Sequence, residues 1–282
     1  MIVSFKKNPL VLSISLIFTI LSSGCTDRFF TPTKELIPNP SVQKYSPKDI
    51  YFKSTDGNML HGWYFKAKED RGTILVCHGN AENISTHVVL DLWLIDAGYN
   101  IFIFDYRGYG RSTGTPHVQG VNAGAEAALE TLIFGLTQNK HERVAIFGKS
   151  LGGAVAVYLI AHSPYKDRVK VLILDSAFSS YRLLAREKIA ETAIGWVFQY
   201  PLSHLINDDY SPVKFINQVW PVPVIVFQGN GDEIVPEHHG RILFDAAIAP
   251  KEFWEVTAPG HVRVQDDKAA RQKMLEVLAE VQ

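Results

Sequence analysis

The sequence predicts an α/β fold, in which a mostly parallel twisted sheet of about eight strands carries helices on both faces and a small helical cap. Short apolar and β-branched runs alternate with segments of helical length over residues 48–282. Central runs such as residues 101–104 (Ile-Phe-Ile-Phe) are continuously apolar, which is typical of strands buried on both faces. About forty residues, 179–220, separate two strands and form the expected cap insertion.

The elements follow from these patterns in chain order. The first two strands, 50–53 and 60–67, flank an Asp56-Gly57 turn signal and predict an antiparallel hairpin. The later strands are predicted at 73–78, 100–106, 143–148, 169–175, 222–228 and 252–257. Helices are predicted at 85–97, 121–137, 151–162, 237–248 and 267–281. In the cap, helical pieces over 181–198 include Trp196 and Phe198, which are expected to line a pocket or to pack on the domain.

The composition excludes several classes of protein. The chain of 282 residues has 28 lysines and arginines against 29 acidic residues, so it lacks the positive charge that neutralises phosphates, and no nucleic acid partner is expected. Apolar residues make up 46% of the chain, which is enough for a buried core and excludes a disordered protein. Two cysteines are too few for a disulfide scaffold.

The first 24 residues have the order of a secretory signal peptide. Lys6 and Lys7 precede the uncharged, largely apolar stretch 10–21, and small residues then lead to Cys25. These twelve residues would span only about 18 Å as a helix, less than the roughly 30 Å of a bilayer core. Residues 8–26 are all uncharged, so an uncleaved anchor is an alternative, as is an ordinary secreted protein.

The end of this segment resembles the bacterial lipobox, in which a signal peptidase cuts before a diacylated cysteine. Residues 21–25 read Leu-Ser-Ser-Gly-Cys, although the usual leucine three places before the cysteine is Ser22 here. The resemblance implies a lipoprotein carrying fatty acids such as palmitate on Cys25, membrane-anchored in the cell envelope, facing the periplasm or the outside. Thr26 rather than aspartate follows, which implies the outer membrane in a two-membrane bacterium. Residues 25–47 would be the lipidated N-terminus and tether.

The strongest chemical signal is the run Gly-Lys-Ser-Leu-Gly-Gly at residues 148–153. It follows a predicted strand and opens a predicted helix, which is the context of a nucleophile elbow centred on Ser150. Two nucleotide-binding motifs fail on spacing, because a P-loop would need glycine at Arg143 and a dinucleotide fingerprint would need glycine at Thr113. We expect no cofactor, and the sequence has no cysteine–histidine cluster that predicts a metal site.

A serine nucleophile needs a general base and a carboxylate that orients this base. In this architecture the chain order is serine, acid, histidine. His261 follows the last predicted strand and is the expected base, whereas His238 and His239 are expected to be solvated neighbours at a helix start. Asp232, on the loop after the strand 222–228, is the expected acid, and Asp175 at the end of the preceding strand is its rival.

The oxyanion of an acyl-transfer intermediate needs two backbone N–H donors. Leu151, the residue after the nucleophile, is one expected donor. The loop after the third strand reads His78-Gly79-Asn80, and Asn80 is the second expected donor. His78 is expected to be a structural hydrogen-bonding residue rather than a catalyst.

With these residues in place, the sequence resembles the α/β-hydrolase superfamily, and most closely its small abhydrolase-domain serine hydrolases. The resemblance implies a catalytic triad of Ser150, Asp232 and His261. After the histidine, relatives often continue with polar residues, whereas Val262 follows here. The stretches that carry the resemblance are residues 78–83, 104–112, 147–153, 175–178, 231–236 and 260–261.

The sequence therefore predicts a serine hydrolase of the carboxylesterase or thioesterase type. Its substrate is expected to be a small-molecule or lipid-like acyl ester or thioester, cleaved through an acyl-enzyme. A peptidase or amidase with the same triad is one alternative. A non-catalytic envelope lipoprotein that binds lipid or a partner is another, although such a protein would have no need of all three triad residues.

Overall fold

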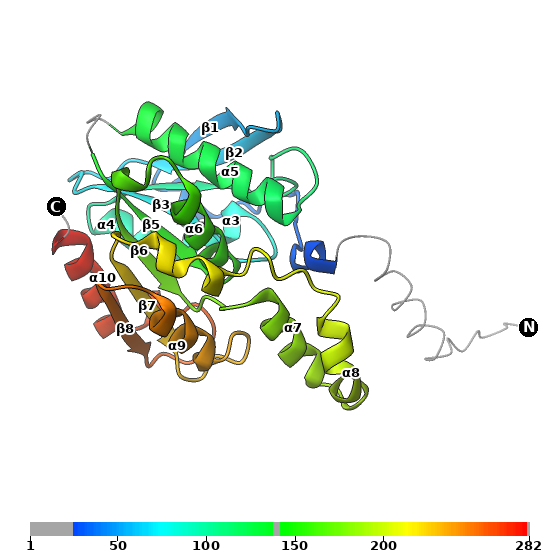
Figure 1. The fold of residues 1–282 in the computed structure, drawn as a ribbon. Coiled ribbons are helices and arrows are strands. Elements are labelled where there is room, and N and C mark those ends of the chain that lie inside the picture. Colours follow the sequence, from blue (N-terminus) through cyan, green and yellow to red (C-terminus); the bar gives the residue numbers. More distant parts are fainter. Residues whose placement is uncertain (1–24, 138–141, 281–282) are drawn as a thin grey trace, which may run out of the picture.

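The computed structural model describes residues 25–137 and 142–280, arranged as Figure 1 shows. Eight strands form one sheet in the order β1-β2-β4-β3-β5-β6-β7-β8. β1 pairs with β2 and β2 with β4 in antiparallel fashion, and all other neighbours are parallel, so the predicted fold class is confirmed. The strands are Lys48–Lys53 (β1), Met59–Phe65 (β2), Thr73–Cys77 (β3), Asn100–Phe104 (β4), Val144–Lys149 (β5), Val169–Asp175 (β6), Val224–Gly229 (β7) and Lys251–Val256 (β8).

Helices cover both faces of this sheet (Figure 1). Every residue of β3 to β7 is buried, as expected for parallel strands between two helical layers. Alternate residues of β4 enter two separate apolar cores, Phe102 and Phe104 into one and Ile101 and Ile103 into the other. The first core includes α5, α6 and α9, and the second includes α3, α4 and α10. Their bounds are Ile84–His87 (α3), Leu92–Asp96 (α4), Val118–Thr131 (α5), Leu151–His162 (α6), Glu237–Ala246 (α9) and Lys268–Glu280 (α10).

The prediction of one continuous helix at residues 85–97 is wrong. A 3-10 turn, Val88–Asp91, separates α3 from α4. This tighter turn contains Asp91, whose buried carboxylate accepts a hydrogen bond from Lys149 of β5 at 2.7 Å. A tertiary ion pair therefore lies where the local sequence predicts an uninterrupted helix.

The segment predicted as a cap forms two helices, α7 (Tyr181–Ala190) and α8 (Ala193–Ser203), followed by short 3-10 turns. They stand out from the body of the molecule in Figure 1. The side chains expected to line a pocket or pack on the domain do not pack on it, since Trp196 is 66% exposed and Phe198 is 51% exposed.

The segment predicted as a tether is bound along the domain. We call residues 31–37 the strap. Thr33 N–H donates to the Glu82 carbonyl at 3.0 Å, and Lys34 Nζ donates to the Ser112 carbonyl at 2.7 Å. A short helix, α2 (Pro40–Gln43), follows the strap. Prolines and polar residues predict the lack of a long helix or strand, but backbone groups of the strap still find partners in remote loops.

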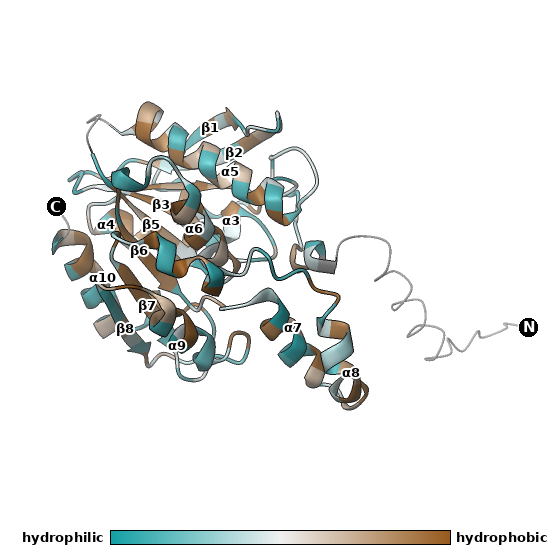
Figure 2. Ribbon diagram, viewed as in Figure 1, coloured by the Kyte–Doolittle hydropathy of each residue, from teal (hydrophilic) through white to brown (hydrophobic). Residues whose placement is uncertain are grey.

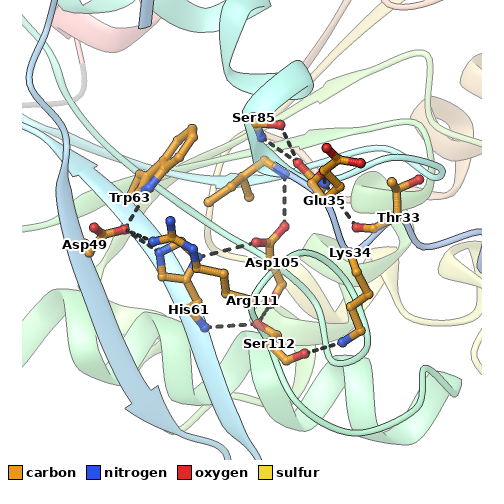
Figure 3. Close-up of polar contacts among 12 residues, drawn as sticks. Thr33, Lys34, Glu35, Asp49, His61, Trp63, Ser85, Asp105, Arg111 and Ser112 are labelled. Atoms are coloured by element: carbon orange, nitrogen blue, oxygen red, sulfur yellow. Dashed lines mark hydrogen bonds and ion pairs between the residues drawn. The ribbon is translucent and has the colours of Figure 1, made fainter. Parts of the chain in front are cut away.

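Figure 3 shows the polar network beneath the strap. The buried carboxylate of Asp105 accepts the Ile84 N–H at 2.9 Å, which anchors the start of α3 to the end of β4. His61 of β2 lies between two carboxylates, with Nε2 2.6 Å from Asp49 Oδ1 and Nδ1 3.5 Å from Asp105 Oδ2. Ser112 Oγ donates to the Asp105 carbonyl at 2.7 Å. This network joins β1, β2 and the loop after β4.

Among the helices of the described ranges, none is long and apolar enough to cross a membrane. The predicted signal peptide, residues 1–24, lies outside the described residues and stays a prediction. The first described residues, Cys25–Phe29, form a 3-10 helix.

Candidate active site

Ser150 forms the sharp turn between β5 and α6. Its backbone has φ +51° and ψ −117°, an unfavourable conformation for a residue with a side chain, and its N–H donates to the Asp175 carbonyl at 2.9 Å. A Cβ atom at Gly152 would overlap the Cys77 carbonyl on β3. The glycine therefore lets the first turn of α6 approach the sheet closely, and the partly exposed Ser150 projects at the carboxyl end of the strands.

His261 and Asp232 are hydrogen-bonded to each other. His261 Nδ1 lies 2.7 Å from Asp232 Oδ2, and the Asp232 side chain is fully buried while that of His261 is 16% exposed. Asp232 Oδ1 accepts the N–H groups of Ile234 and Val235, both at 2.9 Å. Burial acts to raise the pKa of Asp232, but hydrogen bonds and the charge of His261 outweigh it, and the pKa lies below its ordinary value.

The loop that carries His261 crosses the end of β6. Val262 has φ +55° and donates its N–H to Ser176 Oγ at 3.1 Å, while Ser150 donates its N–H to the adjacent Asp175. Ser150 and the loop of His261 are thus both bound to the segment Asp175-Ser176 at the end of β6. Within the described part of the chain, no hydrogen bond joins Ser150 Oγ to His261. In unliganded enzymes such bonds are often long and shorten when substrate binds.

Asp175, the rival acid, has a different environment. Burial raises the pKa of Asp175 to about 7, even though the charge of His261 and a hydrogen bond from Val264 N–H at 3.4 Å favour the ionised form. Its carboxylate also accepts the hydroxyl of Ser176 at 3.3 Å. Among the described residues it makes no hydrogen bond to His261. The geometry therefore pairs the histidine with Asp232, whereas the contacts of Asp175 are with Ser176 and with Val264 on the loop after β8.

The loop after β3, which carries the expected oxyanion donor Asn80, lies against Ser150. A Cβ atom at Gly79 would stand 3.7 Å from Ser150 Cβ. Asn80 follows it, and its Oδ1 accepts hydrogen bonds from Thr31 N–H at 3.0 Å and Tyr109 Oη at 2.9 Å. In the described ranges, neither Asn80 N–H nor Leu151 N–H donates a hydrogen bond. Both donors are therefore available to a ligand.

Two histidines support this loop. His78 is fully buried and stacks on Tyr106 with ring centroids 4.1 Å apart, and its Nδ1 lies 2.7 Å from the Gly79 carbonyl. Burial lowers the pKa of His78 well below its ordinary value, so this histidine is neutral, as a structural residue should be. His87 Nε2 donates to the carbonyls of Asn80 and Ala81 at 3.2 and 3.1 Å.

Lys149 is a residue that sequence reasoning missed. It precedes Ser150, is buried with its partner Asp91, and also donates to the His87 carbonyl at 3.3 Å. This buried ion pair connects the elbow to the segment that follows the loop after β3. No local pattern marks it, because a lysine beside the serine and an aspartate within an apolar helix each predict exposure.

His238 and His239, at the start of α9, do not contact the serine, and the expectation that both are solvated is wrong for His239, which is fully buried. Both Nε2 atoms lie 2.9 Å from oxygens of Glu187 on α7, so the cluster links the cap to the body. These three residues have the donor types and proximity of a metal site, which the sequence analysis did not expect. However, Ser179 N–H donates to His239 Nδ1 at 3.1 Å, which places the proton on Nε2, where it donates to the glutamate. The donor set therefore fits a hydrogen-bonded link better than a metal centre.

The chain is similar in sequence to several known proteins. A family model described as "Serine aminopeptidase, S33" matches residues 68–206. Protein YfhR of Escherichia coli K12, of uncharacterised function, is 30% identical over 246 residues, which cover 85% of this chain and 81% of that protein. The alpha/beta hydrolase domain-containing protein WAV2 of Arabidopsis thaliana is 36% identical over 209 residues, covering 72% of this chain and 67% of the relative.

Solved structures share the fold. The Pyrococcus furiosus esterase Pf2001 superposes with a TM-score of 0.72 at 20% identity, covering 90% of this chain and 98% of that one. Acetyl xylan esterase 1 from Thermoanaerobacterium has a TM-score of 0.64 at 18% identity, with coverages of 88% and 86%. The solved structures show the fold, and the relationship to WAV2 shows the class of protein, an α/β hydrolase. The chain belongs to the α/β-hydrolase superfamily.

Proposed function

We propose that the protein hydrolyses ester or thioester bonds of small-molecule or lipid-like acyl substrates through an acyl-enzyme. The observation that carries the proposal is the 2.7 Å contact between His261 Nδ1 and the buried Asp232 carboxylate, beside the strained turn at Ser150. A protein that only binds a ligand has no need of this combination of groups. The esterase names of two structural relatives agree with this substrate class.

The geometry supports the following sequence of steps. Asp232 holds the proton of His261 on Nδ1, so that Nε2 accepts the proton of the Ser150 hydroxyl as Oγ attacks the acyl carbonyl. The N–H groups of Leu151 and Asn80 stabilise the resulting oxyanion. His261 returns the proton to the leaving alcohol or thiol as the tetrahedral intermediate collapses. Water, deprotonated by the same histidine, then cleaves the acyl-enzyme and restores Ser150.

An aminopeptidase is the second candidate, because the matching family model is described as a serine aminopeptidase. Esters and amides pass through the same acyl-enzyme, so the triad itself does not separate them. The two candidates differ in the leaving group, an alcohol or thiol in one case and an amine in the other.

Two measurements test the proposal. An alkyl fluorophosphonate should label the wild-type protein covalently and should not label Ser150→Ala, because the serine oxygen displaces fluoride. Absence of labelling in the wild type would favour the non-catalytic alternative. A series of p-nitrophenyl esters and acyl thioesters of increasing chain length, assayed beside aminoacyl-anilides, should be turned over faster than the anilides. Faster turnover of the anilides would make the protein a peptidase.

We also propose that Cys25 is lipidated and anchors the protein to an envelope membrane after removal of residues 1–24. The support is the lipobox-like sequence, followed directly by residues that are bound to the folded domain: Thr26 exchanges hydrogen bonds with Asn207 at 3.1 and 2.9 Å. Radiolabelled palmitate should be incorporated by the wild type and not by Cys25→Ser. A wild-type protein recovered without lipid in the soluble fraction would contradict the anchor.

A further inference from the structure

The cap helix α8 carries an unusual concentration of exposed apolar side chains. Of the thirteen large hydrophobic residues that are exposed in the described ranges, five belong to this helix of eleven residues. Figure 2 shows the contrast between the brown segments of α8 and the teal segments of α7. The five are Ile194, Trp196, Val197, Phe198 and Tyr200, with exposed fractions of 76, 66, 62, 51 and 60%. An apolar surface of this kind usually contacts a partner or a membrane.

The exposed side chains point to more than one side of the helix. Ile194, Val197 and Phe198 have the i, i+3, i+4 spacing of one face, whereas Trp196 and Tyr200 share a different face. A groove on a protein partner would cover one face of such a helix. The acyl-chain region of a lipid bilayer can instead surround every side of the helix that does not pack on α7. Tryptophan and tyrosine are the residues that favour the boundary between this region and water.

The cap is held in a defined position. Glu187 of α7 binds His238 and His239 of α9, and Lys188 Nζ donates to the Glu233 carbonyl at 2.6 Å. Glu233 neighbours the proposed catalytic acid Asp232. The base of the cap therefore touches the acid loop, while α8 packs on α7 and forms its outer part in Figure 1.

The chain enters the fold beside this cap. Thr26 bonds to Asn207 just after α8, and the ring of Phe29 meets Tyr181 of α7 edge-on with centroids 5.1 Å apart. Figure 1 places the first described residues on the side of α7 and α8. The uncharged apolar stretch 10–21 and Cys25 precede this point in the sequence. An anchor attached here would bring α8 near the membrane surface.

We propose that α8 is a membrane-docking helix, which inserts its apolar side chains into the interfacial layer of the bilayer and holds the active site at the membrane surface. The charges along residues 181–209 are nearly balanced, with Arg182, Arg186 and Lys188 against four acidic residues, so burial of apolar surface rather than attraction to anionic headgroups drives the docking. This inference rests on the proposed function. If α8 holds the active site at the membrane surface, the substrate is a lipid-like ester that comes from the bilayer.

Brominated lipids test the contact directly, because bromine quenches only nearby indoles. The full chain is reconstituted into vesicles of phosphatidylethanolamine and phosphatidylglycerol with brominated acyl chains. The tryptophan fluorescence of the wild type should be quenched, and added salt should leave this quenching unchanged. Trp196→Phe should largely remove it. Trp220→Phe is the matched control, because Trp220 is 56% exposed but lies outside α8, and this variant should keep the quenching. Equal quenching in Trp196→Phe and the wild type would overturn the proposal.

Activity gives a second, separable measurement. The triple variant Ile194→Ser, Val197→Ser, Phe198→Ser should keep wild-type turnover of a water-soluble p-nitrophenyl ester. Its turnover of the same chromophore on a long-chain ester within vesicles should fall by about tenfold or more, since burial of one large apolar side chain already corresponds to such a factor. Equal losses on both substrates would overturn the role of α8 in docking, as would a self-association through Trp196 in the absence of vesicles. A wild type inactive on both esters but quenched through Trp196 would instead reject only the proposed function.

Discussion

Replacement of Asp232 by asparagine separates the proposed catalytic acid from its rival, Asp175. The amide keeps one oxygen, which can still accept the N–H groups of Ile234 and Val235 that Asp232 Oδ1 binds at 2.9 Å. The other oxygen, 2.7 Å from His261 Nδ1, becomes an N–H donor. His261 must then present an unprotonated Nδ1 to the amide and carry its proton on Nε2. In that tautomer the histidine is unable to accept the proton of Ser150.

The expected loss follows from this change of tautomer. Turnover of a p-nitrophenyl ester should fall on the order of 10⁴-fold, the size of effect that a wrongly protonated histidine has in serine proteases. The fold should persist, because the replaced interaction is one charged hydrogen bond, with a typical contribution of roughly 1.5–3 kcal/mol to the free energy of unfolding. Far-ultraviolet circular dichroism and urea denaturation of Asp232→Asn check this second expectation.

Asp175→Asn is the matched control. Because the pKa of Asp175 is raised to about 7, an amide imitates the protonated form that this buried carboxyl adopts below neutral pH. The amide oxygen can still accept the Val264 N–H, so we expect less than about a tenfold change in turnover. The assay is steady-state turnover, with active serines counted by fluorophosphonate titration. A loss of 10⁴-fold in Asp175→Asn together with an active Asp232→Asn would refute the assignment.

Three further predictions test other contacts. Ser150→Ala and His261→Ala should each lower turnover by about 10⁴–10⁶-fold, and the double variant should be little worse; additive losses would contradict a joint role. Lys149→Met should lower the free energy of unfolding, measured in urea, by about 3–5 kcal/mol because it leaves Asp91 buried and unpaired, and adding Asp91→Leu should restore most of it. The folded state retains a proton on Asp175 between about pH 4 and 7, whereas the unfolded chain loses it. The free energy of unfolding should therefore fall with rising pH across this window, by at most roughly 1.4 kcal/mol per pH unit. Asp175→Asn should remove this slope.

The strap shows where composition misleads. Its prolines and polar residues correctly predict a segment with little regular structure, and from this we expected a tether. A segment without regular structure still has backbone donors and acceptors, and these bind wherever the folded surface offers partners. Thr31 N–H donates to Asn80 Oδ1, so the strap supports the loop that carries a proposed oxyanion donor. The partner lies 49 residues away, which no local pattern reveals.

The cap illustrates a second limit. Apolar residues at helical spacing predict a helix and a buried face, but they do not say what buries it. In α8 those residues are exposed in the folded chain, and Trp196 and Phe198 do not join either core. Burial depends on which elements stand opposite, and the topology leaves this helix on the outside of α7.

The sequence by itself determined the strands, most of the helices and the turn at Ser150, because each depends on residues that are neighbours along the chain. Continuous apolar runs indicate buried strands, and glycines on both sides of a serine indicate a turn too tight for larger residues. The tertiary structure decided that His261 pairs with Asp232 rather than Asp175. Asp175 ends β6 and Asp232 lies on the loop after β7, so both carboxylates are at the same edge of the sheet. Which of them meets His261 depends on how the loop after β8 crosses that edge, and this is set by packing between segments distant in sequence.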